Sequence, residues 1–292
     1  MKVSIIVKTR NGQRHLPELM SVLKNQNFDA KQFEILVVDS GSTDGTLAIA
    51  DASGCKIVQI AQPQLTPGGL LNAGCEAAQG RIVVFLSQDY LPTNRQWLQD
   101  LITPIQRKRA DYVYGQQRGG DSSRFSDKVL FKQFFPDESS IPQDSYFCSN
   151  HNAAMAKSIW KRFKFNESIP CLEDLHLAKE MCRAGLRIGY QANASVTHSS
   201  ASSWQFIRQQ YKNEAIALQD IAPSMTLNAA SALKGFCRDV LLDFQDAQKQ
   251  KVFIRHAIDI ILFRCNQYYG SYMGGLPRLN DADHDCDSID IH

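Results

Sequence analysis

The chain has 292 residues, of which 43% are hydrophobic, and its formal net charge at pH 7 is +2. This length accommodates one large domain or one domain with an appendage, and the near-neutral charge gives no global field for a nucleic-acid partner. The eight cysteines include no Cys-x-x-Cys pair, which argues against a disulfide framework and against a zinc site.

The first ninety residues alternate between strand and helix patterns. Apolar runs rich in β-branched residues predict strands at 3–7, 35–38, 56–60 and 82–86. Helical patterns lie between these strands, at 16–23, after the Ser42-Thr43-Asp44 cap sequence and over 70–79. This alternation predicts an α/β fold with a parallel sheet and right-handed crossovers.

The middle of the chain is less regular. A helix is expected from residue 95 with an interruption near Pro104, and a short strand follows at 112–115. Residues 116–145 are polar but contain four phenylalanines, and we interpret them as a surface excursion that borders a site. Further helices are predicted at 157–163 and 173–184, and further strands at 188–190 and 194–198.

From Trp204 onward the pattern is helical, with breaks near Pro223 and around 245–250. We expect its apolar positions to pack helix against helix. A second interpretation is peripheral contact with the inner face of a membrane, because basic residues flank the apolar turns. These residues are Lys249, Lys251, Arg255 and Arg264.

The N-terminal residues lack the basic and apolar regions of a signal peptide. No uninterrupted apolar run approaches the ~20 residues that a membrane-spanning helix requires. The sequence therefore predicts a soluble cytoplasmic protein, with a domain over 1–203, a helical region over 204–280 and an acidic, disordered tail over 281–292.

Polar residues follow several of the predicted strands. Residues 8–12 follow the first strand, residues 39–45 follow the second, and Asp89 ends the fourth. Ligands of open α/β sheets bind outside the carboxyl ends of the strands, so these tips predict a nucleotide-sized site. The spacings GxGxxG and GxxxxGK[ST] are absent, which disfavours a dinucleotide or P-loop enzyme.

The Asp39 carboxylate is suited to accept from the imide N–H of uracil or thymine, or from guanine. The alternative is an aspartate that shapes a turn or caps a helix. Asp89 has a similar alternative as a solvated loop residue.

Several segments together resemble family 2 glycosyltransferases of the GT-A fold: 3–11 (VSIIVKTRN), 37–46 (VVDSGSTDGT), 71–74 (LNAG) and 85–89 (FLSQD). The Ser-Gln-Asp tip resembles the bacterial rhamnosyltransferase-type branch, as do 114–117 (YGQQ), 147–152 (FCSNHN), 173–174 (ED) and 196–199 (VTHS). The resemblance implies a mostly parallel sheet with helices on both faces, followed by a helical C-terminal region.

The resemblance also implies a nucleotide-sugar site. Thr9 and Arg10 would lie beside the nucleoside, and Asp39 would bind the base. Asn72 would lie near the base or the ribose, and Glu173 would contribute to the same site.

The resemblance implies that Asp89 contacts Mg²⁺ or Mn²⁺ as the remaining acidic member of a DxD-type motif, and that His198 is a second contact to the metal or to the diphosphate. The alternative for His198 is a surface histidine or one whose hydrogen bonds are satisfied within the protein. Asp174 would be the general base, although residue chemistry alone does not separate it from Glu173. Both acids begin a helix, so the helix dipole is expected to lower their pKa values.

The predicted reaction is an inverting sugar transfer. An acceptor hydroxyl, deprotonated by Asp174, attacks the anomeric carbon of a UDP- or dTDP-linked sugar, and the nucleoside diphosphate leaves. The resemblance implies a saccharide or lipid-linked acceptor in surface polysaccharide or glycolipid synthesis. The alternatives are a non-catalytic protein that binds nucleotide sugars or glycans, and a metal-dependent nucleotidyltransferase.

Overall fold

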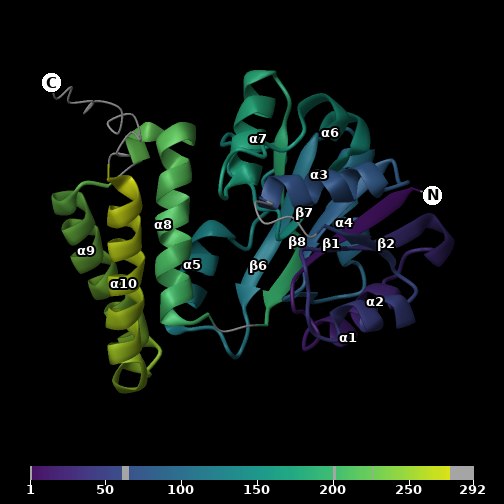
Figure 1. The fold of residues 1–292 in the computed structure, drawn as a ribbon. Coiled ribbons are helices and arrows are strands. Elements are labelled where there is room, and N and C mark those ends of the chain that lie inside the picture. Colours follow the sequence, from purple (N-terminus) through teal and green to yellow (C-terminus); the bar gives the residue numbers. More distant parts are fainter. Residues whose placement is uncertain (1, 61–65, 200–201, 226, 277–292) are drawn as a thin grey trace, which may run out of the picture.

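The computed structural model describes residues 2–60, 66–199, 202–225 and 227–276. Within these ranges, eight strands form one mixed sheet with helices on both of its faces, and helices α8, α9 and α10 stand beside it (Figure 1). The predicted α/β fold is confirmed. The predicted tail over 281–292 lies outside the described residues.

The strand order in the sheet is β3-β2-β1-β4-β7-β6-β8-β5. Neighbours from β3 to β4 are parallel, β7 is antiparallel to both β4 and β6, β8 is parallel to β6, and β5 is antiparallel to β8. The strands are β1 Val3–Thr9, β2 Phe33–Asp39, β3 Lys56–Gln59, β4 Ile82–Ser87, β5 Tyr90–Pro92, β6 Tyr112–Gly119, β7 Asn152–Ala156 and β8 Ile188–His198.

Both faces of the central strands are apolar because helices cover each of them. In β1, Ile5 packs into the core on one face and Ile6 into the core on the other. The Ile5 face is covered by α1 (Leu16–Lys24), α2 (Thr46–Ala52) and α4 (Trp97–Gln106). The Ile6 face is covered by α3 (Pro67–Ala77), α6 (Lys157–Phe163) and α7 (Glu173–Arg183).

The register of β1 brings the predicted strand tips together. Thr9 of β1 lies opposite Asp39 of β2, and Lys8 lies opposite Ser87 of β4. The carboxyl ends of three neighbouring parallel strands therefore meet at one edge of the sheet, where the site was predicted.

Helix α4 runs through Pro104, so the predicted interruption is wrong. Proline removes the hydrogen bond to the carbonyl four residues earlier, which is that of Asp100. The Asp100 carbonyl accepts instead from Gln191 Nε2 of β8 at 3.3 Å. A contact from a distant strand thus compensates for the proline.

Strand β7 was not predicted, because its sequence Asn-Ala-Ala-Met-Ala has weak strand propensity. It nevertheless pairs with β4 on one side and β6 on the other. The segments predicted at 188–190 and 194–198 form one continuous strand, β8.

The C-terminal helices are α8 (Trp204–Ile221), α9 (Ala229–Lys249) and α10 (Phe253–Gly275), and a 3₁₀ turn (Pro223–Met225) precedes α9. Glycines allow α10 to approach α8 closely. A Cβ on Gly270 would lie 2.4 Å from the Arg208 carbonyl oxygen, and one on Gly274 would lie 2.1 Å from that of Lys212. Among the helices in the described ranges, none combines the length and hydropathy of a membrane-spanning segment.

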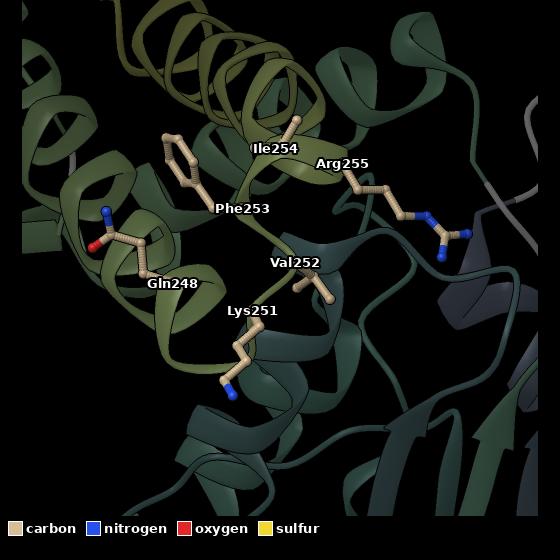
Figure 2. Close-up of a pocket in the computed structure, with 6 residues that line it drawn as sticks. All are labelled: Gln248, Lys251, Val252, Phe253, Ile254 and Arg255. Atoms are coloured by element: carbon tan, nitrogen blue, oxygen red, sulfur yellow. The ribbon is translucent and has the colours of Figure 1, made fainter.

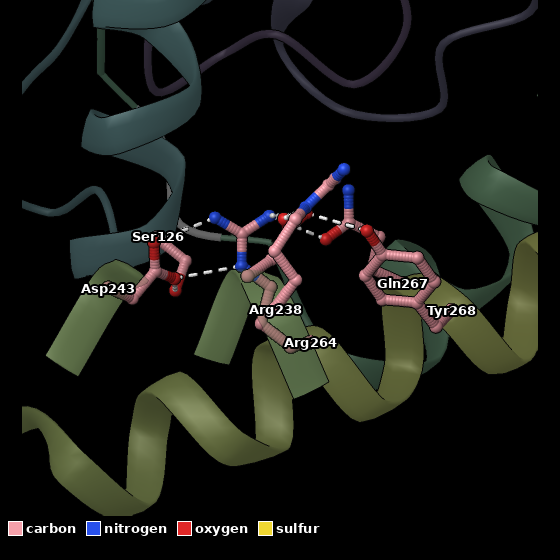
Figure 3. A network of polar contacts seen from close by, with 7 residues as sticks. Ser126, Arg238, Asp243, Arg264, Gln267 and Tyr268 are labelled. Carbon is pink, nitrogen blue, oxygen red and sulfur yellow. Dashed lines mark hydrogen bonds and ion pairs between the residues drawn. The ribbon is translucent and has the colours of Figure 1, made fainter. Parts of the chain in front are cut away.

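A buried ion pair connects the C-terminal helices to α5 (Phe125–Phe134), which packs against β6 (Figure 3). Arg264 of α10 donates two hydrogen bonds of 2.8 Å to Asp243 of α9, and Ser126 of α5 donates to the same carboxylate at 2.6 Å. Arg264 is therefore a buried residue and does not belong to the predicted basic flank of a membrane-facing turn.

Candidate active site

Gln88 joins the tips of β1 and β4. Its Oε1 accepts from the Thr9 hydroxyl and, at 3.1 Å, from the Arg10 amide, while its Nε2 donates to the Arg10 carbonyl at 3.0 Å. A Cβ on Gly12 would lie 2.2 Å from Gln88 Oε1, so a larger residue at position 12 would displace the Gln88 side chain. The middle residue of Ser87-Gln88-Asp89 therefore shapes the site, a role that the sequence did not predict.

The Asp39 carboxylate is buried and already holds the loop that follows it. Its Oδ2 accepts from the amides of Gly41 and Ser42 at 3.0 and 2.9 Å, and its Oδ1 accepts from the Ser42 hydroxyl. These bonds agree with the alternative of a turn aspartate. A nucleobase would have to use the remaining lone pair of Oδ1.

Asn72 joins α3 to the segment that follows α6. Its Nδ2 donates to the Phe165 carbonyl at 2.9 Å and to Glu167 Oε1 at 2.7 Å, and its Oδ1 accepts from Trp160 Nε1 and the Phe165 amide. The protein thus fills both donor and both acceptor positions of this amide. The predicted contact of Asn72 with a base or ribose would require one of these bonds to be exchanged.

Asp89 and His198 meet at the ends of β4 and β8. His198 Nε2 lies 3.0 Å from Asp89 Oδ2, and both side chains are partly exposed. The Tyr90 ring packs against both His198 and His151, with ring centroids 4.8 and 5.0 Å apart. The structure therefore brings together the residues that the sequence assigned to the metal.

A divalent metal fits this pair when a substrate supplies the other ligands. Within the described ranges there is no group of three or more His, Cys, Asp or Glu side chains that could hold a metal ion by itself. Adjacent ligands of an octahedral ion with bonds of about 2.1 Å lie about 3 Å apart. This matches the 3.0 Å between Asp89 Oδ2 and His198 Nε2, and phosphate oxygens commonly complete such sites.

Asp174 and Glu173 are buried at the start of α7. Asp174 accepts from the amides of Asn150 and Leu175, each at 2.8 Å. Burial, followed by the negative charge of Glu173, raises the pKa of Asp174 to about 7. The prediction that the helix dipole lowers the pKa of Asp174 is therefore wrong. The loss of solvent on burial raises this pKa by more than the two amide hydrogen bonds lower it.

Lys8 lies beside the acid pair of α7, and the sequence interpretation did not single it out. Its Nζ lies 3.8 Å from Glu173 Oε1, and its charge lowers the pKa of Asp174. Burial and then the Lys8 charge lower the pKa of His151 to about 3, and His151 Nδ1 is 2.8 Å from Ser87 Oγ. A lysine within the apolar run VSIIVKT was the available signal.

The site therefore contains a buried acid pair, a lysine and a carboxylate–imidazole pair at one edge of the sheet. A sequence profile described as Glycosyl transferase family 2 matches residues 4–163, which is more than half of the chain. This chain belongs to glycosyltransferase family 2. The predicted family is confirmed.

The chain is similar to bacterial glycosyltransferases of several kinds. The O-antigen chain rhamnosyltransferase WbaN of Salmonella anatum is 29% identical over 209 residues, which cover 67% of this chain and 65% of WbaN. The poly(ribitol-phosphate) β-N-acetylglucosaminyltransferase TarS of Staphylococcus aureus is 32% identical over 142 residues, which cover 47% of this chain. That match spans only 24% of the length of TarS.

Solved structures share the fold of this family 2 chain. The mannosyltransferase PcManGT from Pyrobaculum calidifontis, solved in complex with GDP-Man and Mn²⁺, aligns with a TM-score of 0.65 at 17% identity. The alignment covers 94% of this chain and 85% of PcManGT. At this identity the likeness establishes the GT-A-type architecture.

Proposed function

We propose that this family 2 member is an inverting glycosyltransferase that uses a UDP- or dTDP-linked sugar. The observation that carries the proposal is the buried Asp174, whose pKa of about 7 suits a general base and whose neighbours are Glu173 and Lys8. An acid that binds its proton with a pKa close to neutral is able both to accept and to release it.

Asp174 accepts the proton of the acceptor hydroxyl as the new glycosidic bond forms. The hydroxyl oxygen attacks the anomeric carbon from the side opposite the diphosphate, which inverts the anomeric configuration. Glu173 and Lys8 keep Asp174 in the required range, since the Glu173 charge raises its pKa and the Lys8 charge lowers it.

Thr9, Arg10 and Asp39 would bind the nucleoside at the ends of β1 and β2, with Glu173 as a further contact. Asn72 would join them by exchanging one of its four hydrogen bonds to the protein. Asp39 would accept a hydrogen bond from the imide N–H of uracil or thymine through the remaining lone pair of its Oδ1. PcManGT, with its named GDP-Man complex, supports a nucleotide sugar as donor.

Asp89 and His198 would hold Mg²⁺ or Mn²⁺, and the imidazole nitrogen favours Mn²⁺ because Mg²⁺ prefers oxygen ligands. When bound, the metal neutralises negative charge that develops on the diphosphate leaving group. The named Mn²⁺ complex of PcManGT agrees with this choice.

The names of WbaN and TarS support an acceptor from surface polysaccharide synthesis, either a saccharide or its lipid-linked precursor. We propose residues 1–203 as the catalytic unit and 204–280 as a helical region attached to it. A cytoplasmic location is part of the same proposal.

The test is a panel of UDP-, dTDP- and GDP-linked sugars with Mn²⁺, followed by release of the nucleoside diphosphate. Wild-type protein is expected to turn over at least one donor, and Asp174→Asn is expected to be slower by ~10²–10⁴-fold. Asp100→Asn is the matched control, because Asp100 also lies in the first turn of a helix but on α4.

Nucleotide binding without turnover by the wild type would favour the binding-protein alternative. Formation of a nucleotide sugar from a nucleoside triphosphate and a sugar phosphate would favour the nucleotidyltransferase. Equal rates for wild type and Asp174→Asn would remove Asp174 from the mechanism.

A further inference from the structure

The outer face of α10 is apolar along the whole helix. Its exposed apolar side chains recur at helical spacing, at Ile254, Ile258, Ile261, Leu262, Tyr269 and Met273, and the exposed Leu276 follows the last residue of the helix. We call these seven side chains the α10 face. It extends for about 33 Å at 1.5 Å per residue.

The exposure of the α10 face is unusual because the opposite sides of the helix are already packed. Gly270 and Gly274 allow close contact with α8, and Arg264 is buried against α9. Ile254 and Ile258 are 96% and 75% exposed, so core packing does not explain them. An exposed apolar patch of this length marks an interaction surface.

Basic residues lie at the start of the α10 face, where α9 turns into α10. Figure 2 shows Lys251 and Arg255 extending from this turn in different directions, beside Phe253 and Ile254 around a surface hollow. Within residues 254–276, all of them described, Arg255 is the single charged side chain among the exposed ones.

The acidic residues of α9 and α10 do not neutralise the positive charges of Lys251 and Arg255. Each aspartate of α9 and α10 pairs with another base: Asp239 with Arg238, Asp243 with Arg264, Asp246 with Lys249 and Asp259 with Arg124. Within the described ranges, Lys251 and Arg255 are left without an acidic partner.

We propose that the α10 face, with Lys251 and Arg255, binds the surface of an anionic lipid bilayer. Apolar side chains beside free cations are the combination that an interfacial helix presents to acyl chains and anionic headgroups. A second copy of this chain that docks by the same face is the less suitable occupant, because the exposed side chains of residues 254–276 include no acid to pair with Lys251 and Arg255.

The inference does not rest on the proposed sugar transfer, because lipid binding is measured without a donor or acceptor. Lipid binding would nevertheless place the catalytic unit beside a lipid-linked acceptor. Failure of one proposal is therefore distinguishable from failure of the other.

The test is co-sedimentation of the full chain with unilamellar vesicles. Vesicles of phosphatidylcholine with an equal part of phosphatidylglycerol are expected to bind the protein at low salt. Pure phosphatidylcholine vesicles, or high salt, are expected to weaken binding, since part of the attraction is electrostatic.

Lys251→Gln/Arg255→Gln is expected to weaken partitioning into anionic vesicles about 30-fold, at about 1 kcal/mol per cation near the surface. Ile254→Ser/Ile258→Ser is expected to weaken it about tenfold or more, because both side chains would insert into the interface. The matched control Arg107→Gln/Lys161→Gln removes two exposed cations of the α/β part and is expected to bind as the wild type does.

The variants change exposed side chains, and an unchanged thermal transition will verify that they are folded. Absence of binding to anionic vesicles would overturn the proposal, as would equal binding by wild type and both α10 variants. A dimer in light scattering that Ile254→Ser/Ile258→Ser dissociates, without vesicle binding, would assign the α10 face to a second copy instead.

Discussion

Replacing Asp174 by Asn tests the physical basis of the proposed catalysis through protein stability. In the folded protein the pKa of Asp174 is about 7, against an ordinary value of 3.8. The folded state therefore binds this proton more tightly than the unfolded chain does. At low pH both states are protonated and no stability is lost, but stability falls as pH rises from about 4 to about 7.

The size of this effect follows from the two pKa values. Ionising Asp174 in its buried position lowers the free energy of unfolding by about 4 kcal/mol at pH 8 and by about 2 kcal/mol at pH 5. Asn at position 174 carries no charge and does not incur this loss. It does leave the amide of Asn150 or of Leu175 without a good acceptor, which costs about 1–3 kcal/mol at either pH.

The measurement is the difference in Tm between Asp174→Asn and wild type at pH 5 and at pH 8. The amide penalty cancels between the two pH values, so Asp174→Asn should gain about 2–3 kcal/mol relative to wild type on going to pH 8. For a chain of this size that is a change of about 5–10 °C in the Tm difference.

A Tm difference that is the same at both pH values would refute the raised pKa of Asp174, and with it the reason for assigning the base.

Glu173→Gln is the companion variant. Because the Glu173 charge contributes to the raised pKa of Asp174, removing it should move the midpoint of the pH–rate profile below that of the wild type. The wild-type kcat/KM should rise with pH and level off above about 7.

Other predictions concern the metal pair and the C-terminal helices. Asp89→Asn should raise the Mn²⁺ concentration that gives half-maximal turnover by about tenfold or more, measured by metal titration, and an unchanged value would argue against metal binding there. Arg264→Met should lower the free energy of unfolding, measured by urea denaturation, by about 3–5 kcal/mol, because it leaves Asp243 buried without its ion-pair partner. The double variant Asp243→Leu/Arg264→Met should recover part of this loss. Gly274→Ala should cost about 1–3 kcal/mol in the same assay, since its Cβ would lie 2.1 Å from the Lys212 carbonyl oxygen, and a stability equal to wild type would contradict the close helix contact.

The spacing of apolar residues along the chain predicted those strands and helices whose buried positions recur regularly. Strands β1, β2 and β4 are mostly apolar on both faces, and polar tips follow them, so the α/β fold and the edge that carries the site could be read from the sequence. Prediction from local sequence failed where a residue distant in the chain decides the secondary structure. Strand β7 forms between β4 and β6 despite its weak propensity, and Gln191 compensates for Pro104 in α4.

The sequence by itself determined which residue types lie at the ends of the strands, since the polarity of each strand and of its end depends on a local run of residues. Only the tertiary structure decided what each of them is able to do. It gave Asn72 four hydrogen bonds to the protein and bound Asp39 into its own loop. It also buried Asp174 beside Glu173 and thereby raised its pKa, because desolvation and hydrogen bonding depend on neighbours that are distant in sequence.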